Sequence, residues 1–104
     1  ICFNQILYVE QKAHSILIFL TGGEELKAVE KLENIVNQFE GQNFFRCHKS
    51  YLVNLDYINH LDDELRVFSM NEGQNVQISR GSMTKARKAL GTYLFDKTRG
   101  MCKE

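Results

Sequence analysis

Hydrophobic positions along most of the chain either alternate with polar ones or form short runs, and both patterns are typical of β-strands. Apolar runs at residues 6–9 and 16–20 flank a polar connection at residues 10–14. A Thr-Gly-Gly sequence at residues 21–23 follows the second run and is typical of a turn. The pattern predicts a hairpin with His14 near its tip.

Residues 44–58 hold the densest mixture of apolar, aromatic, basic and hydrogen-bonding side chains. Because side chains alternate between the two faces of a strand, every second residue from Phe45 to Val53 would share one buried face. Lys49 falls in that set, and an unpaired ammonium group is costly to bury. We therefore expect the strand to break or bulge around residues 48–50 and to leave Lys49 exposed at a tip. The apolar members of the shared face are Phe45, Cys47, Tyr51 and Val53.

Polar side chains surround this predicted break. A sharp corner leaves backbone donors and acceptors unpaired, and short polar side chains can satisfy them. We therefore expect scaffold roles for His48, Ser50 and Asn54. Arg46 lies alternate to the apolar set, and it could either face a binding partner or bond to backbone carbonyl groups at the corner.

Two segments predict helices. Apolar residues recur at intervals of three and four between residues 24 and 40, which predicts a longer amphipathic helix packed against the sheets, with Gly41 as its stop. Ser82 predicts the cap of a shorter helix that ends near Leu90. The apolar stripe of the first helix consists of Leu26, Val29, Leu32, Ile35, Val36 and Phe39.

Three further strands are predicted at residues 57–61, 65–68 and 76–78. An acidic turn at residues 62–64 joins the first two strands, and a turn at residues 71–73 leads to the third. Successive hairpins favour antiparallel sheets. Three consecutive acidic residues on a turn are usually exposed to solvent, so we expect no metal there.

The 104 residues suggest one domain, and 13 basic residues offset 13 acidic ones. The positive charge is concentrated in the C-terminal part of the sequence, since residues 80–103 contain seven basic residues and one acidic residue. This asymmetry is compatible with an anionic partner. Three cysteines without C-x-x-C spacing suit the reducing cytoplasm. No apolar run approaches the roughly 20 residues needed to cross a bilayer, so we expect no membrane partner.

No sequence pattern indicates an enzyme. A Gly-rich phosphate loop and an H-E-x-x-H motif are both missing from the sequence. Cys47 and His48 are neighbours on a predicted strand and would point to opposite faces, so they should not form a nucleophile and base. We interpret Cys47 as a small buried apolar residue, with a redox-sensor role as the alternative. We expect neither a cofactor nor a metal site.

The pattern F-R-x-H-x-S-Y-x-V-N-x-x-x-I resembles the core signature of the LytTR DNA-binding domain, the output module of many bacterial response regulators. Its residues are Phe45, Arg46, His48, Ser50, Tyr51, Val53, Asn54 and Ile58. The segment Ile6–Glu10 and the step Ser79–Arg80 resemble this family too. The resemblance covers about residues 3–95 of a single domain and leaves residues 96–104 as a loose basic tail.

The resemblance implies a mostly β fold, in which small antiparallel sheets stack into an elongated body with one longer and one short helix. It implies sequence-specific binding to double-stranded DNA, with loops that hold His14, Lys49 and Arg80 in successive major grooves. Arginine can pair with guanine O6 and N7 or clamp a phosphate, so Arg80 is the contact we favour most. The alternatives are a surface salt bridge of Arg80, for example to the acidic turn, and a solvated turn histidine at position 14. Flanking DNA contacts are expected from Lys12, Arg46 and Lys85.

The resemblance also implies a setting in transcription regulation. The chain starts at Ile1, inside an apolar pattern and without Met, so we expect a fragment of a cytoplasmic two-component regulator with a receiver domain upstream. Because base-reading side chains are few, we expect two protomers on direct repeats in a promoter, with RNA polymerase as a further candidate partner.

A protein-interaction module is the alternative function from another class. It would use the predicted helix at residues 26–39 or an exposed sheet edge. Such a module would not need salt-sensitive affinity for DNA.

Overall fold

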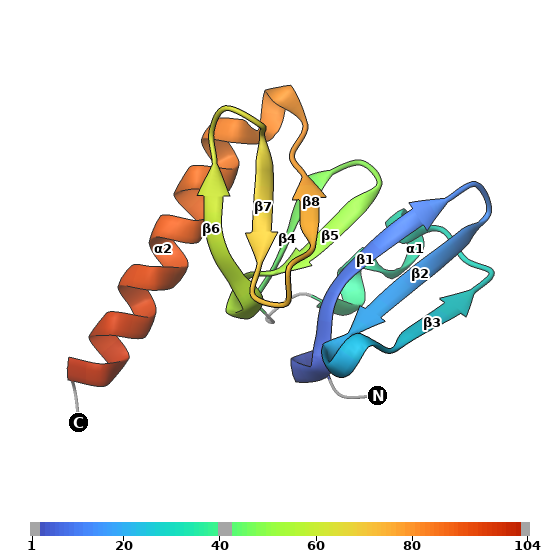
Figure 1. Cartoon of the computed structure of the whole chain (residues 1–104), viewed down its shortest axis with the longest axis horizontal. Coiled ribbons are helices and arrows are strands. Elements are labelled where there is room, and N and C mark those ends of the chain that lie inside the picture. Colours follow the sequence, from blue (N-terminus) through green and yellow to red (C-terminus); the bar gives the residue numbers. More distant parts are fainter. Residues whose placement is uncertain (1–2, 40–42, 103–104) are drawn as a thin grey trace.

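Strands make up most of the structure, a computed structural model that describes the backbone of residues 3–39 and 43–102 and the side chains of residues 4–39 and 43–96 (Figure 1). The strands are β1 (Ile6–Lys12), β2 (Ser15–Leu20), β3 (Glu25–Ala28), β4 (Phe44–His48), β5 (Tyr51–Asn54), β6 (Ile58–Asp62), β7 (Val67–Met70) and β8 (Asn75–Gln77). The helices are α1 (Leu32–Ile35) and α2 (Met83–Cys102). Short 3-10 turns are η1 (Phe3–Gln5), η2 (Thr21–Gly23), η3 (Val36–Phe39), η4 (Leu55–Tyr57) and η5 (Arg80–Ser82).

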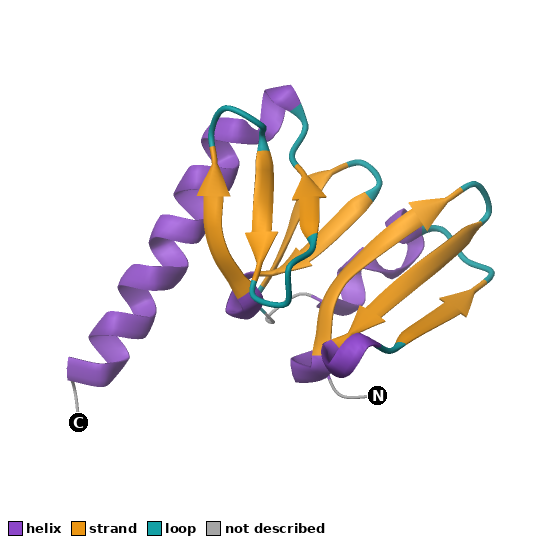
Figure 2. Ribbon diagram, viewed as in Figure 1, coloured by secondary structure: helices purple, strands orange, loops and turns teal. Residues whose placement is uncertain are grey.

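The strands form two antiparallel sheets (Figure 2). The first has the order β3-β2-β1-β5-β4, and the second has the order β6-β7-β8. The described chain measures 43 × 31 × 25 Å along its principal axes, so the body is elongated. The predicted mostly β fold of small antiparallel sheets with two helices is confirmed.

The central strands of the five-stranded sheet, β1 and β5, are buried on both faces. Tyr8 and Val53 are paired across β1 and β5, and they contact a core shared with the second sheet and the start of α2. Their neighbours Val9 and Leu52 point to the opposite face, into a core shared with α1 and η3. Since successive side chains on a strand alternate in direction, one central pair of strands serves both cores.

The predicted helix at residues 24–40 is wrong in its first half. Glu25–Ala28 form β3, which pairs with β2 and becomes the edge of the first sheet. Leu26 is 40% exposed and Val29 is 85% exposed, so neither belongs to a core. Backbone pairing with β2 outweighs the weak preference expressed by apolar spacing. The second half of the stripe does pack, through Leu32 and Phe39, whereas the predicted stop at Gly41 lies outside the described residues.

The second helix is longer than predicted. It begins at Met83, directly after Ser82, but the Ser82 hydroxyl bonds to that of Ser79 and does not form the predicted cap on a described N–H of the helix. The backbone of α2 continues past Leu90 to Cys102, through much of the segment predicted as a loose tail. A single glycine such as Gly91 costs a helix about 1 kcal/mol and does not end it. The Tyr93 hydroxyl donates to the carboxylate of Asp56 in η4 and ties this part of α2 to the body. Within the described ranges, no helix is both long and apolar enough to span a membrane.

Candidate nucleic-acid interface

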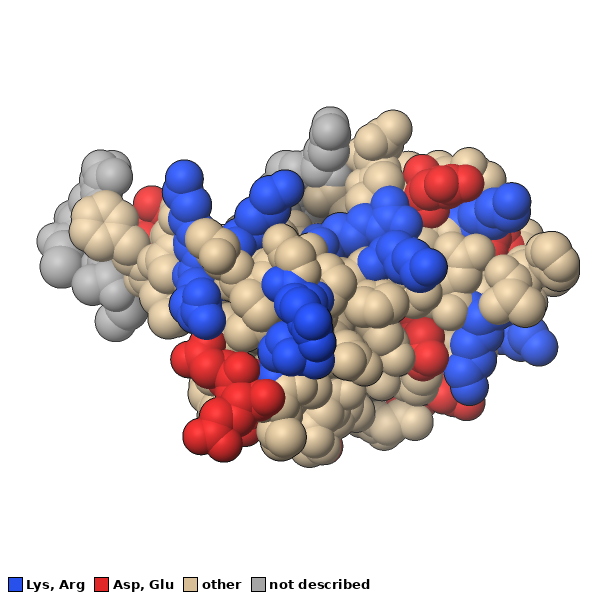
Figure 3. Space-filling model, turned by 90° about the horizontal axis from the view of Figure 1, so that it is seen from above, with Lys and Arg blue, Asp and Glu red and all other residues tan. Residues whose placement is uncertain are grey.

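Three turns lie along one edge of the molecule, at the top of Figure 1. They are the β1–β2 turn with His14, the β4–β5 turn with Lys49, and η5 with Arg80. Viewed from that edge, Lys and Arg side chains are spread along the length of the face, while Asp and Glu gather in a few separate places (Figure 3). The structure thus brings the three predicted loops to one face.

Backbone hydrogen bonds tie these turns to one another. The N–H of Gln11 donates to the carbonyl oxygen of Ser50 over 2.8 Å and joins the end of β1 to the β4–β5 turn. The N–H of Ser79 donates to the carbonyl oxygen of Cys47 over 2.9 Å and joins the residue before Arg80 to β4. The β4–β5 turn therefore lies between the other two and is bonded towards both.

The β4–β5 turn has a polar scaffold in which His48 plays the predicted role, whereas Ser50 takes part through its backbone and its hydroxyl forms no hydrogen bond with a described residue. Nδ1 of His48 accepts from the N–H of Ser50 at 3.1 Å. Nη2 of Arg46 donates to the carbonyl oxygen of Lys49 at 2.7 Å, so of its two predicted roles Arg46 performs the scaffold role here. These bonds fix the backbone of the turn and leave the Lys49 side chain exposed. The break predicted around residues 48–50 is confirmed.

Asn54 supports the same hairpin from inside the fold. Only 1% of it is exposed. Nδ2 donates to the carbonyl oxygen of Ile6 at 2.8 Å, and Oδ1 accepts from the N–H of Asp56 at 2.9 Å. Both ends of the amide are thus paired, which confirms the predicted scaffold role.

The β1–β2 turn consists of two residues, Ala13 and His14. Lys12 and Ser15 pair across its base, and Lys12 is exposed. Ala13 has a φ of 53°, in the left-handed region that costs an alanine roughly 1–2 kcal/mol. Nε2 of Gln11 donates to the carbonyl oxygen of Ala13 at 3.1 Å and stabilises this backbone. His14 is exposed beyond it.

Arg80 is exposed in η5, and its side chain has no hydrogen bond or ion pair with any described residue. The hydroxyl groups of Ser79 and Ser82 bond at 2.7 Å and close this turn. The acidic turn bonds elsewhere, since Asp63 pairs with Nε of Arg87 at 2.8 Å. The alternative in which Arg80 pairs with the acidic turn is therefore wrong. Lys85 is exposed in the first turn of α2.

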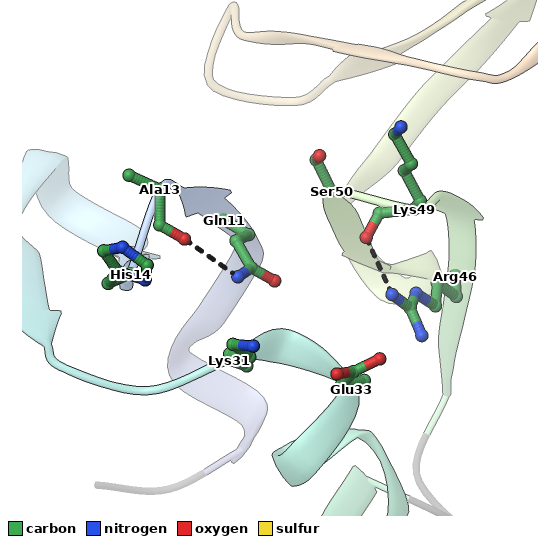
Figure 4. Close-up of a pocket in the computed structure, with 8 residues that line it drawn as sticks. All are labelled: Gln11, Ala13, His14, Lys31, Glu33, Arg46, Lys49 and Ser50. Atoms are coloured by element: carbon green, nitrogen blue, oxygen red, sulfur yellow. Dashed lines mark hydrogen bonds between the residues drawn. The ribbon is translucent and has the colours of Figure 1, made fainter.

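An open groove of about 460 Å³ separates the β1–β2 turn from the β4–β5 turn (Figure 4). It is lined by Gln11, Ala13, His14, Lys31, Glu33, Arg46, Lys49 and Ser50. His14 and Lys49 thus share one groove, whereas Arg80 is not among its lining residues. Sequence reasoning missed Gln11 and Lys31, because neither belongs to a motif and Lys31 falls within the predicted longer helix but outside its apolar stripe.

Cys47 is fully buried, and its thiol donates to the carbonyl oxygen of Gln77 at 3.3 Å. Burial raises the pKa of this thiol to about 12. The thiol is therefore protonated at neutral pH and is not a nucleophile. His48 points its Nδ1 at the N–H of Ser50 and does not activate the thiol.

Comparison with known proteins agrees with this geometry. A family model described as the LytTr DNA-binding domain matches residues 1–91. A solved structure, the LytTr DNA-binding domain of a Bacillus cereus protein described as a methyl-accepting/DNA response regulator, superposes with a TM-score of 0.76 at 24% sequence identity. That match covers 88% of this chain and 85% of the other, and it shows the same fold. No curated protein sequence matches. Because the family model covers nearly the whole chain, the chain belongs to the LytTr DNA-binding domain family.

Proposed function

We propose that the chain binds double-stranded DNA sequence-specifically through the three turns, as the output domain of a bacterial two-component transcriptional regulator. One observation carries this proposal. His14, Lys49 and Arg80 are exposed on one face, on turns that backbone hydrogen bonds connect to one another. Their side chains have no hydrogen bond or ion pair with any described residue. Polar side chains in such a position are available to a ligand.

The dimensions and chemistry of this face suit duplex DNA. Successive major grooves on one side of B-DNA lie about 34 Å apart, and the long axis of the molecule is 43 Å. Arg80 can present its planar fork to guanine O6 and N7, while Lys49 offers an ammonium group and His14 an imidazole N–H. Lys12 and Lys85 flank these turns and contact phosphates, which fixes the register of the protein on the duplex. Arg46, whose Nη2 holds the β4–β5 turn, adds a phosphate contact through Nη1.

The small number of base-reading side chains bears on the assembly. A single domain with three such side chains binds modestly, so two protomers occupy direct repeats in a promoter. An upstream receiver domain controls this pairing in the cytoplasm, and RNA polymerase is a further partner. Each of these points is inferred from the family to which the chain belongs.

The test is selection from a labelled pool of random duplexes at two salt concentrations, followed by sequencing of the retained DNA. Enrichment of a short repeated motif, with affinity that falls as salt rises, is the expected result. Retention without enrichment would refute sequence-specific recognition and leave only electrostatic adhesion.

A sheet edge favours the second candidate function, a protein-interaction module. β3 is the edge strand of the first sheet, and Leu26 and Val29 are exposed on and beside it. The helix predicted at residues 26–39 is not formed as one helix, because its first part is β3 and a later part is α1. The protein-interaction alternative therefore depends on the sheet edge alone. If the folded domain retains no DNA even at low salt, this function replaces DNA binding.

A further inference from the structure

The groove between the β1–β2 and β4–β5 turns concentrates positive charge from separate elements (Figure 4). Lys49 comes from the β4–β5 turn, Arg46 from β4, and Lys31 from the segment between β3 and α1. Glu33 is the one acidic residue that lines the groove. Three basic side chains therefore line the groove together with one acidic side chain and the imidazole of His14.

These cations are not neutralised within the described part of the chain. The ammonium groups of Lys31 and Lys49 have no hydrogen bond or ion pair with a described residue. Arg46 uses Nη2 for the carbonyl oxygen of Lys49, and its Nε is buried without a partner in the described structure. Like charges brought together in this way repel one another, and a bound anion would relieve the repulsion.

Gln11 fixes the walls of the groove relative to one another. Its backbone N–H bonds to Ser50 at 2.8 Å, its Nε2 donates to Ala13 at 3.1 Å, and its Oε1 accepts from the N–H of Leu32 at 3.0 Å. These bonds connect both turns and the segment that carries Lys31. The groove is therefore held open at a set width before any ligand arrives, which lowers the entropic cost of binding.

We propose that this groove binds one phosphodiester of the DNA backbone, and that Lys31 is a phosphate contact from outside the three base-reading turns. The inference rests on the proposed function. Successive major grooves of a duplex are separated by a minor groove and the two sugar-phosphate strands that border it, so a turn that enters a major groove has a strand beside it. The cationic groove lies between the turns of His14 and Lys49, where that strand would run.

The test compares Lys31→Gln with the matched control Lys27→Gln. Lys27 is exposed on β3 but does not line the groove. Affinity for the selected duplex is measured by fluorescence anisotropy over a series of salt concentrations. We expect Lys31→Gln to reduce the magnitude of the slope of log K against log salt by about 0.9, the value for one phosphate contact on B-DNA. The preferred DNA sequence should stay the same, because phosphates carry no base identity.

Glu33→Gln should change the affinity for DNA in the opposite direction. Removal of the only acidic group in the groove should tighten binding at low salt, and the effect should fade as salt rises. If Lys31→Gln keeps the wild-type slope as Lys27→Gln does, while the wild type still binds its motif, the phosphate site is refuted and the proposed function stands. If the wild type binds no DNA, both are refuted. Circular dichroism of each variant confirms that it is folded.

Discussion

Replacement of Asn54 tests how much the buried hydrogen bonds beneath the turns contribute to the stability of the fold. Its amide joins β1, through the carbonyl group of Ile6, to the start of η4, through the N–H of Asp56. β1 is the first strand of the hairpin with His14 at its turn, and η4 directly follows β5, the second strand of the hairpin with Lys49 at its turn. Asn54→Ala removes both bonds in a site where only 1% of the residue is exposed, so water cannot easily replace the amide.

The expected loss is the sum of two effects. A buried carbonyl group that loses its partner costs about 1–3 kcal/mol. Loss of a side-chain cap costs about 1 kcal/mol. Asn54→Ala should therefore lower the free energy of unfolding by about 2–4 kcal/mol. With an m-value of about 2 kcal/mol/M, the urea midpoint should fall by about 1–2 M.

Urea denaturation followed by circular dichroism measures this change. Asn59→Ala is the matched control, because Asn59 is exposed on β6, and it should shift stability by less than about 0.5 kcal/mol. Asn54→Asp keeps an acceptor for Asp56 but turns an oxygen towards the carbonyl oxygen of Ile6. It should be at least as unstable as Asn54→Ala at neutral pH and recover in part when acid protonates the carboxylate. A loss below about 1 kcal/mol for Asn54→Ala would refute the reasoning.

Three other predictions concern the turns and the buried thiol. Arg80→Ala should cost about 1–3 kcal/mol of binding free energy and relax the preference at one base position in a repeated selection, and equal weakening for all sequences would instead mean a phosphate contact. Ala13→Gly should raise the free energy of unfolding by up to about 1 kcal/mol in urea titrations, because glycine adopts the φ of 53° without strain, and a loss of stability would contradict this. In a chain with Ser at positions 2 and 102, Cys47 should react with a disulfide reagent at pH 8 only as urea unfolds the protein, and DNA binding should not respond to oxidant. Because the pKa of Cys47 is about 12 in the folded protein, above its ordinary value, its contribution to stability is full below about pH 9 and is lost as the pH rises towards 12. Rapid reaction of the folded protein, or oxidant sensitivity that Cys47→Ser abolishes, would favour the redox role.

Local patterns were enough to predict the hairpins and the scaffold of the β4–β5 turn. Period-two alternation and turn residues act over a few positions, and both are visible without knowledge of the fold. The cost of burying Lys49 predicted a break that the structure contains. The pairing needs of a sharp corner predicted the scaffold roles of His48 and Asn54.

The predictions are wrong where contacts between residues far apart in the sequence determine the structure. The apolar spacing from Leu26 onwards is helical in period, but β2 offers an unpaired edge, and pairing with it makes β3. The end of α2 was misplaced because the contact between Tyr93 and Asp56 joins residues 37 positions apart. Neither contact leaves a signal in the local pattern.

The sequence by itself determined the mostly β class, the family and the exposed positions of His14, Lys49 and Arg80, because these depend on short-range alternation and on a contiguous motif. Only the tertiary structure decided which residues meet. It gave Arg46 a bond at the corner, paired the acidic turn with Arg87, and brought Gln11 and Lys31 to the groove beside His14. The physical reason is that a groove between hairpins is built by bonds between residues far apart in the chain, and their meeting depends on strand register and sheet order rather than on any local pattern.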